Sequence, residues 1–386
     1  MRTAHILNTL LAALMLASCA TVYKERTPVT NGGVTVSMVL DASPLAQGAQ
    51  ASDLPRVDMI EMTPEMIDFV DQHVDRSEGR NDKLKALADA VMGEDGFELA
   101  YDDSTSTAAG TFQKRRGNCL SFTNLFIAMA RNLGLDANYQ EVEIPPDWSI
   151  AGETYLFSQH VNVTVDMKNG QNRIVDFNLY DFNTSYHMEV ISDQRARAHF
   201  FNNIGAERML AGETSQAFLN FRQSIREDSS FSPAWTNLGI LYRREGYPAY
   251  AETAYLEALN IDRNNVTAMS NLANLYEEEN HSELAEQYMM RVEVHRLKNP
   301  YYRFQVANVA FIEGDYRTAI ENLEHAIKMR KDEDRFYFLM SLCYLMSGDK
   351  QAAQRWMKKA ETIAKKNPDK EKYQHKLDIL RGSEID

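Results

Sequence analysis

Hydrophobic positions in the C-terminal half of the chain recur with a period of 34 residues. Alanine occupies five positions at this spacing, and a small residue and a turn residue are in phase with each: Ala217, Ala251, Ala285, Ala319 and Ala353. Large side chains recur as well, and only Arg303 departs from the apolar pattern. Each unit has the pattern of two amphipathic helices that bury their apolar faces by stacking. The pattern predicts an all-α solenoid of five repeats over 196–367, followed by a capping helix and tail over 368–386.

The preceding segment, residues 56–195, changes from a helical to a strand-like period along its length. Thr63 before Pro64 predicts a helix start, and 81–92 has the pattern of a second helix. The long apolar run after Cys119 predicts a buried central helix. Alternating positions then predict strands over 139–144, 155–166 and 173–178. Helices followed by a short antiparallel sheet predict an α+β domain.

The N-terminus has the pattern of a secretion signal over residues 1–18. Arg2 precedes a short apolar core that is too short to span a bilayer, and the sequence LASC then ends at Cys19. Residues 19–55 are rich in Thr, Ser, Ala, Gly and Pro, which predicts a flexible tether. Within the tether, the alternation over 34–40 favours a strand.

LASC resembles the lipobox of bacterial lipoproteins, in which the signal is cut before a cysteine that carries the lipid. The resemblance implies that Cys19 is lipidated and that the protein is anchored to a membrane of the bacterial cell envelope. Ala20 replaces the aspartate that retains such proteins at the inner membrane, which implies the outer membrane, facing the periplasm. The alternative is an ordinary secretory signal with a chance cysteine.

Charge and composition narrow the classes of partner and cofactor. A net charge of −14 argues against a nucleic-acid partner. With Cys19 lipidated, Cys119 and Cys343 remain, which are too few for a disulfide framework and are expected to be free thiols. The sequence has no paired Cys/His spacing for a metal and no phosphate-binding glycine loop, so no metal and no cofactor are expected.

Cys119 stands where the polar turn RRGN gives way to the apolar helix. A helix N-terminus stabilises a thiolate, and Arg115 and Arg116 add positive charge nearby. A cysteine nucleophile also needs a base and a group that orients the base. His160 and Asp176 lie on the two later predicted strands and offer both.

Each of these residues has a plainer alternative. Cys119 can be a small buried hydrophobe, which is a common fate of free cysteine. His160 can be a hydrogen-bonded strand residue, and Asp176 can pair with a surface cation. His187 is a second candidate base, in a predicted loop, and Cys343 has the surroundings of a packing residue.

The elements RRGNC, QHVNVTV and IVDFN, in this order, resemble the transglutaminase-like superfamily, in a bacterial branch found beside tetratricopeptide repeats. The unit SPAWTNLGILYRREG resembles such a repeat. The family places a Cys-His-Asp triad on a papain-like α+β fold. The resemblance implies that Cys119 is the nucleophile, that His160 is general base and then acid, and that Asp176 orients His160. Gln113 stands at the spacing of a papain-like oxyanion glutamine, and the backbone N–H of Cys119 is the alternative donor.

The turn around Asn169-Gly170 decides whether His160 and Asp176 share a face of the sheet. A two-residue loop would place Asp176 opposite Val163, on the face away from His160, because side chains alternate along a strand. A three-residue loop, 168–170, places Asp176 opposite Asn162 and therefore on the same face as His160. We predict this register, with a type I turn and a glycine bulge.

The repeats predict a surface for a partner. In the repeat family the first helix of each unit faces a concave groove, and the apolar residues at these positions gather near the end of the array: Tyr301, Phe304, Phe311, Phe338 and Leu342. An apolar concave face usually receives a peptide or protein, although the capping helix, the preceding domain or another copy can also cover it.

The two resemblances together imply a lipid-anchored protein with a transglutaminase-like cysteine site and a partner-binding repeat domain. As an enzyme it would be a cysteine peptidase, amidase or transamidase that hydrolyses an amide or transfers an acyl group on a peptide or peptidoglycan-type substrate. The alternative is a non-catalytic scaffold or adaptor for envelope complexes, in which the repeats bind the partners.

Overall fold

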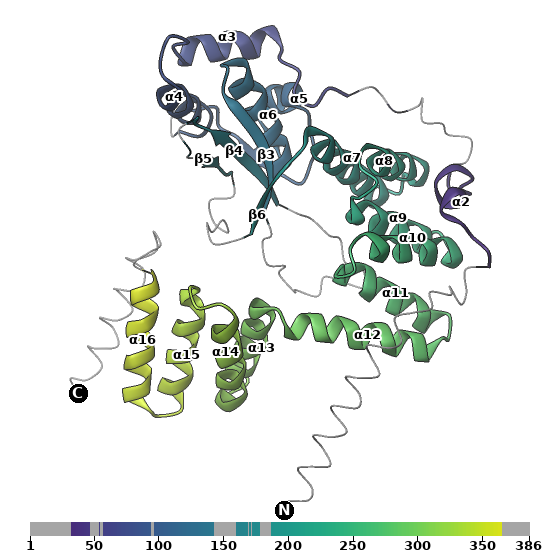
Figure 1. Ribbon diagram of the computed structural model, residues 1–386, viewed down its shortest axis with the longest axis vertical. Helices are drawn as coiled ribbons and strands as arrows, with labels where there is room; N and C mark the ends of the chain where they lie inside the picture. Colours follow the sequence, from purple (N-terminus) through teal and green to yellow (C-terminus); the bar gives the residue numbers. More distant parts are fainter. Residues whose placement is uncertain are drawn as a thin grey trace, which may run out of the picture.

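The computed structural model describes residues 32–46, 54, 57–93, 96–142, 160–168, 170, 172–177 and 187–364. An N-terminal α+β region with an antiparallel sheet is followed by stacked helix pairs, as predicted (Figure 1). The predicted signal, Cys19 and the predicted capping helix lie outside the described residues.

The α+β region is built around one central helix, α6 (Cys119–Asn132), in which every residue from Leu120 to Ala130 is buried. Helices α3 (Pro64–His73), α4 (Arg80–Met92) and α5 (Ala108–Lys114) pack around it. Because α6 is apolar nearly all round, it can be covered on every side. Its C-terminal turn is closed by Gly134 at φ +75°, as a helix-ending glycine should be.

A four-stranded antiparallel sheet covers one side of α6, in the order β5-β4-β3-β6. Its strands are β3 (Asp136–Val142), β4 (His160–Asp166), β5 (Asn172–Val175) and β6 (Met188–Ile191). A short parallel pair, β1 (Ala100–Tyr101) and β2 (Arg116–Gly117), lies just before α6. The alternation of the sequence predicted β3, β4 and β5, and it missed β6 and helix α5.

The register between β4 and β5 is the predicted one. Val163 pairs with Val175 and Asp166 pairs with Asn172, which places residue 176 next in line opposite Asn162. The predicted turn type is wrong, because Lys168 has φ +60°, opposite in sign to the first central residue of a type I turn. The Lys168 ammonium contacts Asp136 at 2.5 Å and Asp166 at 3.5 Å. The ion pair with Asp136 is a tertiary contact that a local turn rule does not contain.

The strand expected over 34–40 is wrong, because this segment forms a helix, α2 (Val36–Asp41), capped by Thr35. The segment packs on the repeats, where α2 lies beside α10 (Figure 1). The Tyr242 hydroxyl donates to the carbonyl of Val39 at 2.6 Å, and Val39 is fully buried. Part of the predicted tether is therefore docked, because contacts with the repeats outweigh the weak local preference of a short apolar stretch.

Five helix pairs form the repeat array. They are α7 (Asp193–Leu210) with α8 (Thr214–Glu227), α9 (Ser232–Arg244) with α10 (Pro248–Ile261), α11 (Val266–Glu278) with α12 (Ser282–Leu297), α13 (Pro300–Ile312) with α14 (Tyr316–Met329), and α15 (Asp334–Met346) with α16 (Lys350–Ala364). The small residues allow close approach, since a Cβ on Gly239 would lie 2.5 Å from the Tyr255 ring.

The array is divided between its third and fourth repeats. The links between pairs span 228–231, 262–265 and 330–333, but only 298–299 at this junction, because α12 continues through the position of the turn. Arg303, the residue that breaks the repeat pattern, donates to the carbonyl of Leu297 at 3.1 Å, at the end of that extended helix. The last two repeats consequently have a hydrophobic core of their own.

Exposure confirms the division. Val309 on α13 is 50% exposed, whereas Leu241, Leu275 and Cys343, at the matching positions of other repeats, are 1%, 2% and 0% exposed. Met289, Met290 and Val294 on α12 are likewise exposed. The faces that stack at the other junctions are therefore open at this one, and Figure 1 shows α12 leading away from the first repeats toward α13.

Helix α7 belongs to both parts of the molecule. Ala196, Phe200 and Phe201 contribute to the core of the α+β region, while Ala198 and Met209 contribute to the core of the first repeats. The first repeat is thus packed directly onto the preceding domain and is not held by a linker.

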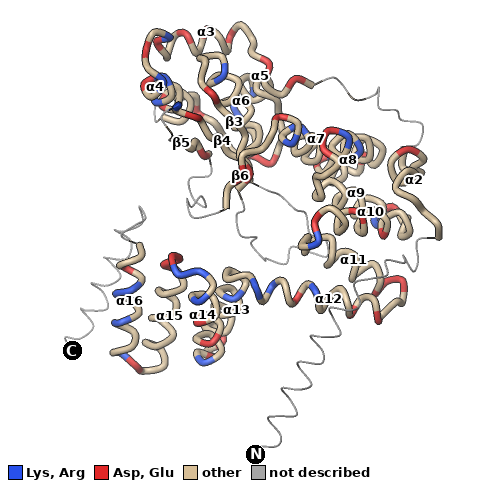
Figure 2. The backbone as a smooth tube through the Cα atoms, viewed as in Figure 1, with Lys and Arg blue, Asp and Glu red and all other residues tan. Residues whose placement is uncertain are grey.

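Acidic and basic residues are interspersed along both the α+β region and the repeat array (Figure 2). Among the described residues, no helix combines the length and the apolar character that crossing a bilayer requires.

Candidate active site

Cys119 is the first residue of α6, and the preceding turn fixes its position. The Asn118 side chain accepts a hydrogen bond from the backbone N–H of Ser121 at 3.0 Å, which caps the helix. The first N–H groups of a helix have no acceptor within the helix, and they carry the positive end of its dipole. The Cys119 thiol, which is partly exposed, therefore stands where a thiolate and an oxyanion are both favoured.

The turn before Cys119 tolerates no side chain at Gly117. A Cβ there would lie 2.6 Å from the Ser121 Cβ and 2.8 Å from its hydroxyl oxygen. Strand β2 pairs Gly117 with Tyr101 of β1, so the tyrosine lies beside the cysteine turn. Burial, and then the charge of Cys119, raise the pKa of Tyr101, although 65% of the residue is exposed. Tyr101 therefore lines the solvent side of the site.

His160 is the first residue of β4 and Asp176 directly follows β5, and their side chains face one another. The His160 Nε2 donates to both carboxylate oxygens of Asp176, at 2.8 and 2.9 Å, and both side chains are buried. The Cys119 side chain lies near enough to this ring to raise the pKa of His160. The structure thus brings the three predicted residues together.

The protonation of His160 is governed by these partners. Burial alone would lower the pKa of His160, but the interactions with Asp176 and Cys119 outweigh it and raise the pKa to about 9. The ring is therefore a cation at neutral pH, so the resting pair is an imidazolium beside a cysteine. An imidazolium stabilises a thiolate and can give a proton to a leaving amine.

Asn162 is a further residue of the site that the sequence reasoning did not single out as functional. It is fully buried, and its Nδ2 donates to Asp176 Oδ2 at 2.7 Å. Asp176 is therefore held from two sides, by His160 and by Asn162. The signal was present, because residues two apart on a strand share a face.

The other residues predicted for the site are exposed, and the two arginines contact residues outside this centre. Gln113 is exposed on α5, and in the described part of the chain no hydrogen bond joins it to Cys119 or His160. His187 is exposed just before β6. The Arg115 guanidinium stacks 4.7 Å from the centre of the Phe97 ring, and Arg116 pairs with Asp102 at 3.4 Å.

The second free cysteine, Cys343, is fully buried in the core of the last two repeats, and burial raises the pKa of its thiol to about 11. It therefore serves as an internal reference for an inert thiol. The predicted groove residues Tyr301, Phe304, Phe311, Phe338 and Leu342 are half-buried against the core of the same two repeats.

The comparisons with known proteins agree with this arrangement. The profile of the transglutaminase-like superfamily matches residues 67–174, which include Cys119 and His160 and end just before Asp176. A tetratricopeptide-repeat profile matches residues 232–265 and 334–367. The chain thus carries a transglutaminase-like core domain followed by tetratricopeptide repeats. No curated protein matches it significantly.

Solved structures give a looser likeness. A crystal structure of MamA is 19% identical, covers 44% of this chain and 93% of its own, and superposes with a TM-score of 0.25. A crystal structure of YrrB, described as a tetratricopeptide-repeat protein with an unusual peptide-binding site, is 18% identical, covers 47% and 92%, and has the same TM-score of 0.25. At these values the likeness says nothing of function.

Proposed function

We propose that the protein is a cysteine amidase or acyltransferase in which Cys119, His160 and Asp176 act as a catalytic triad. The observation that carries the proposal is the His160 ring, which is bonded through Nε2 to Asp176 and lies near enough to Cys119, at the start of a buried helix, for the cysteine to raise the pKa of the ring. A histidine in a merely structural role has no need of a cysteine at a helix N-terminus as its second partner.

The chemistry follows from the protonated ring. The Cys119 thiolate attacks the carbonyl carbon of an amide, and the negative charge moves to the carbonyl oxygen, where first-turn N–H groups of α6 are placed to donate hydrogen bonds to it. The C–N bond then breaks as His160 gives its proton to the departing nitrogen, which leaves as an amine. The product is a thioester on Cys119 and a neutral His160.

The second half of the reaction regenerates the enzyme. Neutral His160 takes a proton from water as the water oxygen attacks the thioester carbonyl, and the thiolate leaves with a free carboxylic acid as product. An amine in place of water gives transamidation by the same steps. Asp176 stays ionised and holds the ring in place throughout. We favour hydrolysis of a peptide or peptidoglycan-type amide, with a protein or peptide partner bound by the repeats.

The proposal is tested by trapping the thioester. The full chain is mixed with synthetic peptidoglycan stem peptides and glutamine-containing peptides, quenched in acid, and weighed intact by mass spectrometry. We expect a mass increase that corresponds to the acyl fragment, located on Cys119 and absent in Cys119→Ser. If no peptide leaves an adduct and none is cleaved, the scaffold alternative is supported.

We also propose that the mature protein is held on the envelope by a lipid on Cys19, which the lipobox-like LASC supports. Several acyl chains anchor a protein stably where one does not. Metabolic labelling with an alkyne fatty acid in a bacterial host is expected to tag the wild-type chain and to spare Cys19→Ser. Equal labelling of the two chains would contradict lipidation at this residue.

A further inference from the structure

We propose that Glu207, on the first helix of the repeat array, is a positioning residue for the active-site cysteine. This inference rests on the proposed role of Cys119 and adds to it a connection between the two parts of the molecule. Glu207 does not touch Cys119 itself. It acts through the loop 104–106 and the residue that caps α6.

The connection is a continuous chain of hydrogen bonds. The backbone N–H of Thr105 donates to Glu207 Oε1 at 2.8 Å. The Thr105 hydroxyl oxygen accepts from Asn118 Nδ2 at 2.8 Å, and the Asn118 Oδ1 in turn caps α6 by accepting from the N–H of Ser121 at 3.0 Å. Asn118 immediately precedes Cys119. Glu207 therefore fixes the loop, and the loop fixes the orientation of the capping amide.

The loop also holds α6 directly. The N–H of Ser106 donates to the Ser121 hydroxyl oxygen at 2.8 Å, and the N–H of Asn118 donates to the carbonyl of Ser104 at 3.0 Å. Thr105, between Ser104 and Ser106, is 7% exposed. If Glu207 were lost, the N–H of Thr105 would be left without its acceptor in a buried position, and the loop would move to satisfy it.

The environment of Glu207 suits this role. Burial is the largest influence on its carboxyl group and raises the pKa of Glu207, and the hydrogen bond from Thr105 opposes that rise. A long acidic side chain on a repeat helix would otherwise extend into solvent. The hydrogen bond with Thr105 therefore explains why this carboxyl group lies against the preceding domain.

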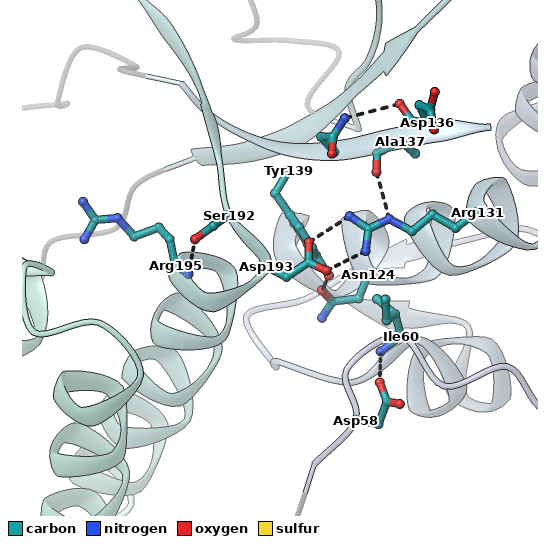
Figure 3. A network of polar contacts seen from close by, with 11 residues as sticks. Asp58, Ile60, Asn124, Arg131, Asp136, Ala137, Tyr139, Ser192, Asp193 and Arg195 are labelled. Atoms are coloured by element: carbon teal, nitrogen blue, oxygen red, sulfur yellow. Dashed lines mark hydrogen bonds and ion pairs between the residues drawn. The ribbon is translucent and has the colours of Figure 1, made fainter. Parts of the chain in front are cut away.

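Helix α7 also contacts α6 at the end of α6 that is far from Cys119. Arg131, near the end of α6, donates from its two terminal nitrogens to the two oxygens of Asp193, at 2.7 and 2.8 Å (Figure 3). The same guanidinium donates through Nε to the carbonyl of Ala137 at 2.9 Å. Asp193 is the first residue of α7 and Glu207 lies near its end. The two ends of α6 are thus tied to the two ends of the first repeat helix.

This symmetry supplies a matched control. Glu207→Ala removes the contact near the start of α6, where Cys119 lies, and Asp193→Ala removes the contact near the end of α6. Both remove one carboxylate that joins α7 to the α+β region, so both should lower stability. Only Glu207→Ala should change the chemistry of Cys119. Glu207→Gln keeps an amide oxygen in place of the accepting carboxylate oxygen and should therefore preserve the reactivity of Cys119.

The experiment measures alkylation of Cys119 by iodoacetamide in the full chain at pH 5.5, resolved by site with mass spectrometry. We expect Glu207→Ala to slow alkylation roughly five- to tenfold, the size of effect that follows the loss of a helix cap. Glu207→Gln is expected to remain within about twofold of wild type, as a side chain that keeps the hydrogen-bond acceptor should. Asp193→Ala is expected to alkylate at the wild-type rate.

The outcomes separate this inference from the proposed function. Circular dichroism and thermal melts establish that each variant is folded at the assay temperature. A wild-type Cys119 that reacts as slowly as Cys343 would contradict the catalytic role and this inference with it. A reactive wild type with an unchanged Glu207→Ala, or with equal losses in Glu207→Ala and Asp193→Ala, would overturn the inference alone.

Discussion

Replacing His160 with alanine is expected to slow alkylation of Cys119 at pH 5.5 by roughly a hundredfold. An unassisted thiol with a pKa of about 8.5 is only ~0.1% thiolate at that pH, and a paired thiolate is somewhat less nucleophilic than a free one. In the wild type, the pKa of His160 is raised to about 9, so the imidazolium is present throughout the acidic range and stabilises the thiolate. The rate is measured with iodoacetamide and peptide mapping.

His187→Ala is the matched control for this variant, because His187 is the other histidine that the sequence offered as a base and it is exposed before β6. Its loss should leave the rate unchanged. Cys343, fully buried in the separate core of the last two repeats, reports whether a variant has loosened that part of the chain as well. A His160→Ala chain that alkylates at the wild-type rate would remove His160 from the site.

Gly117→Ala is expected to destabilise the protein by about 2–3 kcal/mol, the cost of forcing a methyl group into a packed site. The new Cβ would lie 2.6 Å from the Ser121 Cβ, inside the turn that presents Cys119. The N-terminus of α6 must shift to make room, so alkylation of Cys119 in the folded variant should slow as well. Urea denaturation gives the stability, and peptide mapping gives the rate.

Gly134→Ala provides the comparison at the opposite end of α6. Gly134 has φ +75°, but a Cβ there meets nothing within 4 Å. Alanine at this position should cost about 1 kcal/mol through backbone strain and should leave Cys119 unaffected. Equal stability losses at the two glycines, with no change in thiol reactivity at Gly117→Ala, would show that the turn before Cys119 is not a steric constraint.

Much of the site was visible in the sequence because its determinants are local. The apolar run after Cys119 predicted a buried helix, and Asn169-Gly170 limited the hairpin to two registers with opposite consequences for Asp176. The observed pairing of Asp166 with Asn172 is the one that serves His160. Asn162 needed only the alternation of side chains along β4 to be found beside Asp176.

The features that escaped prediction depend on contacts between distant segments. Lys168 adopts its left-handed conformation beside Asp136, which no turn rule includes. Helix α2 packs on α10, and the local sequence of a short alternating stretch cannot predict that contact. Arg303 was visible as a break in the repeat, but its bond to Leu297 at the end of an extended α12 required the structure. Glu207 gave no signal, because its partner lies in another domain.

The scaffold alternative also has physical support in the repeat array. The open faces of α12 and α13, marked by Met290 and Val309, offer exposed apolar surface that a protein partner would bury. Partner binding and catalysis are compatible, and the question that separates the two accounts is whether Cys119 is reactive.

The most direct measurement is the alkylation rate of Cys119 in the wild-type chain as a function of pH between 5.5 and 7.5. The proposal that the His160 imidazolium holds Cys119 as a thiolate predicts a rate that changes by less than about threefold over this interval. The alkylation rate of an ordinary thiol would instead fall about tenfold for each unit of decreasing pH, or roughly a hundredfold from pH 7.5 to pH 5.5. That second result would contradict the proposal that Cys119, His160 and Asp176 form a catalytic triad.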